Sequence, residues 1–216
     1  SWLKNYPEGV DWEQTFDAHP LWKLLDDAVI RFPNNQLIDF LGKTYTYVEV
    51  GDLVDRAAAG FQRIGVGKGV KVGLFLPNCP QFIISYFGIL KAGGTVVNYS
   101  PLYSEQELKH QIEDSQTDIM VTLNLTALYP KMKAMLEQSR LKTLVIGTMT
   151  EVLPFPKNLL FPLFKRADIA AVPNDKNHIA FAQLTNNHRA SKAVDLAPIK
   201  DIAVLQYTSR LTGPSN

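Results

Sequence analysis

The sequence predicts an α/β fold, with a mainly parallel sheet that has helices on both faces. Runs of Val, Ile and Leu that are apolar throughout recur along the chain, as expected for strands buried on both sides. Segments with apolar residues at helical spacing separate these runs, and glycine or proline marks most of the boundaries. This alternation spans about residues 44–147 of a chain of 216 residues, which is long enough to bury a full core.

Residues 1–43 are expected to form an arm with a helix and small strands. The stretch 1–20 is rich in Trp, Tyr and Pro and shows no clear period. A helix is predicted over about residues 21–29, because apolar residues recur there at helical spacing before Pro33. Two short strands, LIDFL and TYTY, are expected on either side of a turn at Gly42 and Lys43.

Capping boxes mark the start of two helices within residues 44–147, the predicted sheet subdomain. Thr46-x-x-Glu49 begins a helix that stops at Gly65, and Ser104-x-x-Glu107 begins another. Two more helices are predicted at PQFIISYFGILKAG and ALYPKMKAMLEQS, each with a proline near its start. FIISYFGIL is expected to pack in the core rather than to line an acyl tunnel. The predicted strands are VKVGLFL, TVVNY, DIMVTL and KTLVIG.

Residues 148–216 are expected to form an irregular connecting segment that ends in one more strand. Up to residue 197 this segment contains several prolines and no clean strand pattern. Within it, NLLFPLFKR (158–166) is apolar and ends in basic residues. We expect this stretch to pack inward as a short helix, because short apolar runs usually do. A contact with a membrane surface is the alternative.

The composition is that of a globular protein inside the cell. The 22 basic and 21 acidic residues are nearly balanced, which argues against a nucleic-acid partner. Cys79 is the one cysteine, which excludes an internal disulfide framework and a cysteine-based zinc site. The N-terminus lacks a signal-peptide layout, and the apolar stretch 82–90 is far shorter than the roughly 20 residues that span a bilayer. We expect a cytoplasmic protein, with a peripheral membrane contact as the further option.

No catalytic or metal-binding pattern stands out within the predicted sheet region. The glycines of GVGKGVKVG (65–73) follow a helix and precede a strand, the reverse of a Walker-type loop, so a helix cap and a turn are predicted. A surface role is the default for His178 and His188, and the histidines lack metal-ligand spacing. We therefore predict no catalytic residue and no metal ligand in this chain.

The last segment, DIAVLQYTSRLTGPSN, has the layout of a phosphate site. A strand leads into a turn that contains Thr208, Thr212 and Gly213. Open α/β sheets present ligands beyond the carboxyl ends of their strands. Threonine hydroxyls and free backbone N–H groups can hold phosphate oxygens there, and glycine lets the backbone approach closely. An ordinary Ser/Thr/Gly loop would look the same, so these residues alone leave both interpretations open.

Several stretches together resemble the adenylate-forming superfamily, specifically the bacterial long-chain fatty-acid–CoA ligases. WLKNYPEGV resembles the N-terminal arm of these enzymes, and residues 76–121 resemble their first core motif. DIAVLQYT resembles the strand that leads into their phosphate-binding loop. The likeness runs nearly end to end and is weakest over 148–197. It implies the N-terminal subdomain of the adenylate-forming ligase fold, in an incomplete form.

The resemblance implies a two-step ligase that uses ATP, magnesium and coenzyme A. A fatty-acid carboxylate would attack the α-phosphate of ATP to give acyl-AMP and pyrophosphate, and coenzyme A would then displace AMP. The family loop reads Tyr-Thr-Gly-Gly-Thr-Thr-Gly and continues to Pro-Lys-Gly. The positions that match it are Tyr207, Thr208, Thr212 and Gly213. Of these, the resemblance implies that Thr208, Thr212 and Gly213 bind the nucleotide.

Other positions of the loop depart from the family. Ser209 and Arg210 replace glycines, Leu211 replaces threonine, and no lysine follows. If the family backbone has positive φ at the glycine positions, each replacement costs on the order of 1 kcal/mol in strain. Arg210 could instead contribute charge to a phosphate. The family's later motifs would all lie beyond Gly213, so we expect that these residues alone do not complete adenylation.

Three hypotheses follow for the function of the chain. It is a fragment of an active ligase, or a divergent non-catalytic homologue that binds acyl chains or a partner. The third hypothesis is a ligand-binding module unrelated to ligation, which the length of the likeness disfavours. An incomplete domain would also expose apolar surface, so self-association is expected.

Overall fold

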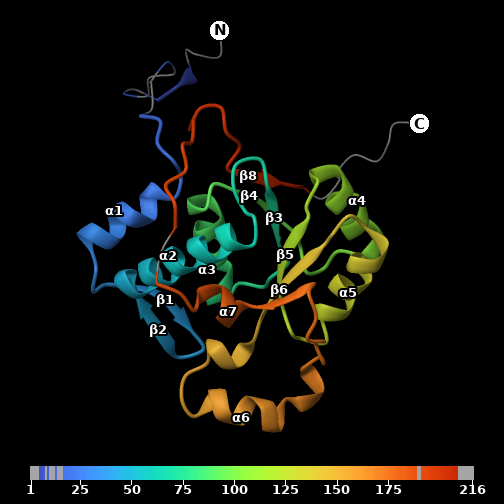
Figure 1. The fold of residues 1–216 in the computed structure, drawn as a ribbon. Coiled ribbons are helices and arrows are strands. Elements are labelled where there is room, and N and C mark those ends of the chain that lie inside the picture. The colour runs from blue at the N-terminus through green and yellow to red at the C-terminus, as the bar shows by residue number, and fades with distance from the viewer. Residues whose placement is uncertain (1–4, 8, 10–12, 14–16, 189–190, 209–216) are drawn as a thin grey trace.

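A six-stranded parallel sheet forms the centre of the protein (Figure 1). The structure is a computed structural model that describes residues 5–7, 9, 13, 17–188 and 191–208. The strand order is β7-β6-β5-β3-β4-β8, and every neighbouring pair is parallel. The strands are β3 (Lys71–Leu74), β4 (Thr95–Asn98), β5 (Ile119–Leu123), β6 (Thr143–Gly147), β7 (His178–Ala180) and β8 (Val204–Gln206). The predicted α/β class is confirmed.

Helices cover both faces of this sheet (Figure 1). One group is α2 (Tyr47–Arg63), α3 (Pro80–Lys91) and α7 (Phe181–Thr185), and the other is α4 (Glu105–Ser115) and α5 (Tyr129–Gln138). The split follows from the strand order. The chain moves from β3 to β4 in one direction, and from β4 to β5 and β6 in the other. Because crossovers in parallel sheets are right-handed, reversing the direction puts the next helices on the opposite face.

The N-terminal arm packs beside this sheet through a second, smaller core. It consists of α1 (Lys23–Arg31) and the antiparallel strands β1 (Gln36–Phe40) and β2 (Lys43–Thr46). Gly42 has a φ of 94°, which suits the tight turn between the two strands. Lys91 of α3 forms ion pairs with Asp26 of α1 at 2.8 Å and with Asp55 of α2 at 2.7 Å. The arm is thereby joined to the helices that cover the sheet.

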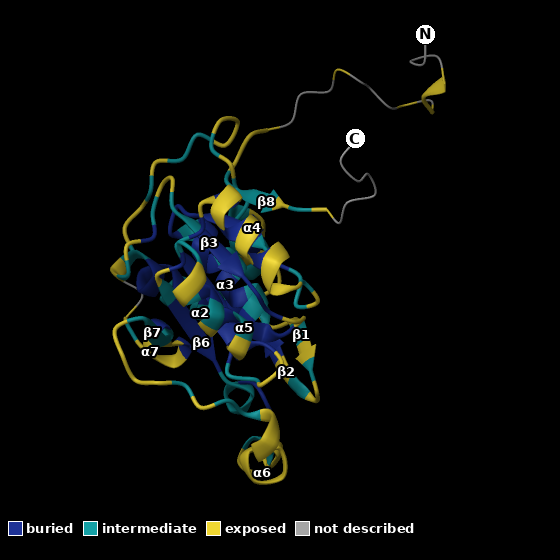
Figure 2. Ribbon diagram, turned by 90° about the vertical axis from the view of Figure 1, so that its right-hand side faces the viewer, coloured by how far each residue is buried: buried dark blue, intermediate teal, exposed yellow. Residues whose placement is uncertain are grey.

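The main core lies along the strands and the inner sides of these helices (Figure 2). All five residues of β5 are buried, as are Val72, Gly73 and Leu74 of β3. Gly73 has a packing role at the centre. A Cβ at this position would lie 2.7 Å from both Cε of Met120 and Cε2 of Tyr99. The neighbouring strand β5 and the residue after β4 therefore approach β3 too closely for any side chain there.

Both predicted capping boxes are confirmed. At the start of α2, the N–H of Thr46 donates to Oε2 of Glu49 at 2.7 Å, and the N–H of Glu49 donates to Oγ1 of Thr46 at 3.4 Å. The same exchange joins Ser104 and Glu107 at the start of α4, at 2.8 and 3.3 Å. Hydrogen bonds from the Ser104 hydroxyl and backbone lower the pKa of Glu107 below its ordinary value of 4.5.

The glycine-rich stretch 65–73 is a helix cap and turn, as predicted. α2 ends at Arg63, and Gly65 and Gly69 have φ angles of 93° and 86° before β3 begins at Lys71. These left-handed backbone conformations favour glycine and reverse the chain from helix to strand.

Two expectations for residues 148–197 are wrong. The segment contains a strand, β7, which pairs with β6 at the edge of the described sheet. The apolar stretch NLLFPLFKR does not pack inward. It forms most of α6 (Lys157–Phe164), which lies between the short 3-10 turns η2 (Met149–Glu151) and η3 (Arg166–Asp168), and no residue of α6 is fully buried. Figure 2 shows α6 projecting from the body of the protein as an exposed lobe.

α2 and α7 pack tightly at Gly60. A side chain at this position should therefore lower the stability of the fold. A Cβ at residue 60 would collide with the carbonyl oxygen of Leu184 and would lie 2.7 Å from its Cγ. We expect Gly60→Ala to lower the free energy of unfolding by about 1–3 kcal/mol, because α7 must shift. Gly67→Ala is the control, since nothing lies within 4 Å of a Cβ there. Urea denaturation measures both, and equal stabilities for the two variants would contradict the packing described here.

The capping box of α4 predicts a dependence of stability on pH. The folded pKa of Glu107 lies below its ordinary value of 4.5. Its contribution to stability is therefore complete above that value and is lost as the pH falls through the folded pKa. We expect wild type to lose more unfolding free energy than Glu107→Gln between about pH 5 and pH 3. Glu105→Gln is the matched control, because it removes a carboxylate of the same turn without breaking the capping box. An equal loss of stability with pH in the two variants would contradict the role of the box.

Candidate functional site

The carboxyl ends of β4 and β8 lie side by side at one edge of the sheet. Asn98 and Gln206, the last residues of these strands, are in register, and Nδ2 of Asn98 donates to Oε1 of Gln206 at 2.8 Å. The chain that leaves β8 begins with Tyr207 and Thr208, and the chain that leaves β4 begins with Tyr99. The predicted phosphate turn thus begins at the carboxyl edge of the sheet, where open α/β sheets bind their ligands.

Tyr207 is tied to α4 by a hydrogen bond from its hydroxyl to Oδ2 of Asp114. Desolvation, this hydrogen bond and the negative charge of Asp114 raise the pKa of Tyr207 well above its ordinary value of 10.0. Tyr207 therefore stays neutral and remains a donor at physiological pH. Because Tyr207 directly precedes Thr208, the bond holds the entry to the turn against the end of α4.

The end of α4 is itself held by a buried polar cluster. The hydroxyl of Tyr99 lies 2.9 Å from Oγ of Ser115 and 2.9 Å from Oγ1 of Thr117. Burial is the main cause that raises the pKa of Tyr99 to about 12. Nε2 of Gln111 donates to the carbonyl of Asn98 at 2.8 Å, which joins α4 to the last residue of β4. Asp114 thus sits on a helix end with little freedom to move.

Two buried amide oxygens near this edge accept no hydrogen bond within the described part of the chain. They are Oδ1 of Asn98 and Oε1 of Gln111. Each of these amides uses its nitrogen in the contacts given above. Among the described residues, both oxygens therefore lie buried and unpaired near the point where β4 and β8 end.

The structure describes only the first part of the predicted nucleotide-binding turn. Thr208 follows β8 and is exposed. Thr212 and Gly213 lie outside the described residues, as do the departures at Ser209, Arg210 and Leu211. The sequence analysis missed the support for the turn, because Asp114 and Tyr207 are 93 positions apart in the chain and Asp114 belongs to no recognised motif.

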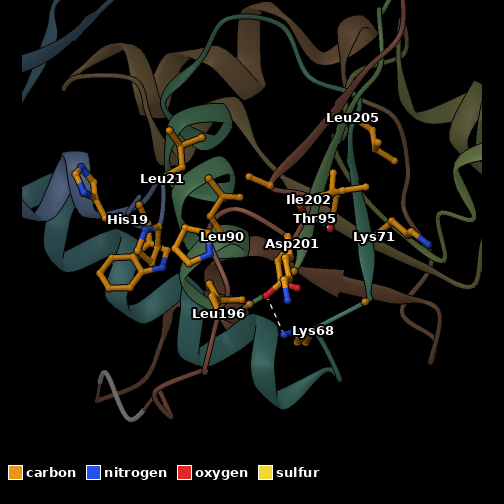
Figure 3. A pocket seen from close by; sticks show the side chains of 18 residues that line it. His19, Leu21, Lys68, Lys71, Leu90, Thr95, Leu196, Asp201, Ile202 and Leu205 are labelled. Carbon is orange, nitrogen blue, oxygen red and sulfur yellow. Dashed lines mark hydrogen bonds and ion pairs between the residues drawn. The ribbon is translucent and has the colours of Figure 1, made fainter. Parts of the chain in front are cut away.

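A pocket of about 520 Å³ lies at the opposite edge of the sheet, near the amino ends of β3, β4 and β8 (Figure 3). Leu21, Leu90 and Leu205 supply apolar lining, and Lys68 and Asp201 form an ion pair at 2.8 Å. The predicted phosphate turn begins at the other edge, the carboxyl edge, which is where parallel sheets usually place ligands.

His178 does not have the surface role expected by default. Its side chain is only 7% exposed, and its Nδ1 lies 2.7 Å from Oδ1 of Asp175. Its Nε2 lies 3.0 Å from the hydroxyl of Tyr129 in α5, so His178 links β7 to the neighbouring helix. The hydrogen bond from His178 is the main cause that lowers the pKa of Asp175. His188, in contrast, is exposed.

No group of three or more His, Cys, Asp or Glu side chains is placed to hold a metal ion among the residues that the structure describes. Within the same residues, no helix combines the length and the apolar character needed to cross a membrane.

Comparisons with solved structures show the same fold. The chain matches the crystal structure of a long-chain-fatty-acid-CoA ligase from Archaeoglobus fulgidus with a TM-score of 0.70 and 20% identity, over 93% of this chain and 36% of that one. It matches the anthranilate CoA ligase AuaEII, solved with anthranoyl-AMP, with a TM-score of 0.73 and 15% identity, over 94% of this chain and 35% of that one. The sheet and its helices correspond to the N-terminal subdomain of adenylate-forming ligases.

Comparisons of sequence extend over nearly the whole chain. It is 37% identical to a long-chain-fatty-acid–CoA ligase of Bacillus subtilis and 30% identical to one of Escherichia coli O157:H7, in each case over 98% of this chain. The chain spans 38% of the length of each of these relatives. The family model for AMP-binding enzymes matches residues 25–214. The chain therefore belongs to the AMP-binding enzyme family.

Proposed function

We propose that the chain is the N-terminal part of a long-chain fatty-acid–CoA ligase. The observation behind this proposal is the 37% identity to a relative of that name over 98% of the chain. The reaction would join a fatty acid to coenzyme A through acyl-AMP, at the expense of ATP and with magnesium present. A cytoplasmic location is proposed with it, since that compartment holds ATP and coenzyme A.

The part of the chain nearest the chemistry is the turn after β8. We propose that Thr208, Thr212 and the backbone at Gly213 bind phosphate oxygens of ATP, with the hydroxyls and N–H groups as donors. The bond from Tyr207 to Asp114 supports this role because it orients the start of the turn. Neutralising and positioning the phosphates is the main task of such loops.

The residues that follow fit this task poorly. Ser209 and Arg210 place side chains where the family loop has glycines, and no lysine follows Gly213 in the 216 residues. Three residues of the turn, 209–211, therefore lack the composition that lets a loop close around a triphosphate. We propose that the 216 residues on their own do not form acyl-AMP.

A chimera tests the ligase assignment and the effect of residues 209–211 on activity. Residues 1–213 of this chain would replace the aligned residues of the Bacillus subtilis relative, in one form unchanged and in another with Ser209→Gly, Arg210→Gly and Leu211→Thr. We expect the repaired chimera to make palmitoyl-CoA from palmitate, ATP and coenzyme A, and the unchanged one to be at least about 100-fold slower, because the turn cannot hold the phosphates. The measurement is pyrophosphate release together with thioester formation.

Each alternative outcome has a clear meaning. An inactive repaired chimera with an unfolding midpoint near that of the relative would contradict the ligase assignment and favour a non-catalytic homologue. Equal activity of the two chimeras would show that residues 209–211 are tolerated. Tighter ATP binding by the unchanged turn than by its Arg210→Gly variant would show that Arg210 contacts a phosphate.

The bond between Tyr207 and Asp114 predicts a positioning effect in the repaired chimera. We expect Tyr207→Phe to lower kcat/KM for ATP about fivefold, the equivalent of one hydrogen bond of about 1 kcal/mol. Adding Asp114→Asn to Tyr207→Phe should then have little further effect, because the two groups act through one bond. Tyr103→Phe is the matched control, since Tyr103 lies in the segment after β4 and takes no part in the bond to Asp114. Equal losses in both tyrosine variants would contradict this role.

A further inference from the structure

The α6 lobe, residues 148–170, combines a firmly attached base with an exposed apolar tip. At its entry, Nζ of Lys43 donates to the carbonyl of Glu151 at 3.0 Å, and Val152 and Leu153 are buried. At its exit, the N–H of Ala170 donates to the carbonyl of Asn124 at 2.8 Å. The lobe is thus an ordered projection that is attached to the body of the protein at both ends.

The tip of this lobe is an apolar surface, which we call the α6 surface. It consists of five side chains that are 41–80% exposed: Phe155, Leu159, Leu160, Leu163 and Phe164. The four that belong to α6 span an arc of about 140° around the helix. Phe161, on the other side of α6, is partly buried, so the helix rests on one side and presents the opposite one outward.

Basic residues border the α6 surface. Lys157, Lys165 and Arg166 flank the apolar side chains, and Asp168 is the one acid between residues 155 and 168, which leaves a net charge of +2. All four residues are exposed. Nζ of Lys157 donates to the carbonyl of Leu41, which sets it at the edge of the apolar surface, and Lys165 forms an ion pair with Asp168 at 3.4 Å.

We propose that the α6 surface docks on the headgroup region of an anionic lipid bilayer. An apolar helical face bordered by lysine and arginine is the chemistry of a helix that lies in a membrane interface. The eight residues of α6 extend about 12 Å, so α6 lies on the bilayer and does not cross it. The border of net positive charge complements the anionic headgroups of such a bilayer.

The inference goes beyond the proposed ligase function and does not need it. Lipid binding can be measured with a protein that has no ligase activity. A failure of the lipid-binding proposal therefore leaves the ligase proposal intact, and the reverse also holds. The two agree chemically, because long-chain fatty acids partition into bilayers.

Co-sedimentation with vesicles tests the docking surface on the purified chain. Vesicles of phosphatidylcholine alone are compared with vesicles of equal parts phosphatidylcholine and phosphatidylglycerol. We expect the protein to sediment with the anionic vesicles, and less so at high salt. Leu163→Ser/Phe164→Ser should weaken this partitioning at least about tenfold, since two inserted side chains are lost.

A charge variant and a matched apolar control complete the design. Lys165→Gln/Arg166→Gln should reduce partitioning about tenfold for the anionic vesicles alone, because each basic residue near such a surface adds to binding. Ile30→Ser/Leu102→Ser removes side chains that are 78% and 91% exposed elsewhere in the chain, and should bind as wild type does. Circular dichroism verifies that every variant folds, which their exposure leads us to expect.

Three results would overturn the proposal. The wild-type protein could stay in the supernatant with both kinds of vesicle. Leu163→Ser/Phe164→Ser could sediment as wild type does, which would place the contact elsewhere. Light scattering could also show a wild-type dimer that this variant converts to a monomer, without vesicle binding. The α6 surface would then be covered by a second copy of the chain.

Discussion

Close packing of β3 between β5 and β4 positions the other elements around the candidate site. No side chain fits at Gly73, because Met120 of β5 and the ring of Tyr99 already occupy the space where a Cβ would point. Tyr99 begins the segment after β4, and its hydroxyl pairs with Ser115 and Thr117 at the end of α4. Close packing at the centre of the sheet thereby fixes the end of α4. Asp114 is on that end and holds Tyr207 at the candidate site.

β8, a strand from the far end of the chain, pairs with β4 at one edge of the sheet. β4 has β3 on one side, and β8 covers its other side with three residue pairs. Oγ1 of Thr95 also donates to the carbonyl of Ile202 at 2.7 Å just before β8 begins. These bonds align the carboxyl ends of two strands that are distant in the sequence. The turn after Tyr207 consequently starts beside α4, where the polar support for it lies.

The α6 lobe departs from the rule that apolar segments pack inward. Its Leu and Phe side chains add no burial to the core, yet the lobe is joined to the β1–β2 turn and to the segment after β5 by hydrogen bonds. Its attachment depends on Val152 and Leu153 at the base and on backbone contacts at the exit. Folding of the sheet therefore leaves the apolar tip exposed in the described part of the chain.

Most of the local structure follows from short patterns in the sequence. Capping boxes, glycine caps and apolar runs predicted the helices and strands of residues 44–147, because their causes lie within a few residues of one another. The turn motif likewise identified Thr208, Thr212 and Gly213 as candidates. Which elements meet became clear only in the folded protein. Examples are the pairing of β8 with β4, the bond from Tyr207 to Asp114, the burial of His178 and the exposure of α6. Each of these features depends on contacts between residues that are far apart in the chain. A local pattern shows that a helix is apolar, but it does not show whether another part of the protein is in place to bury it.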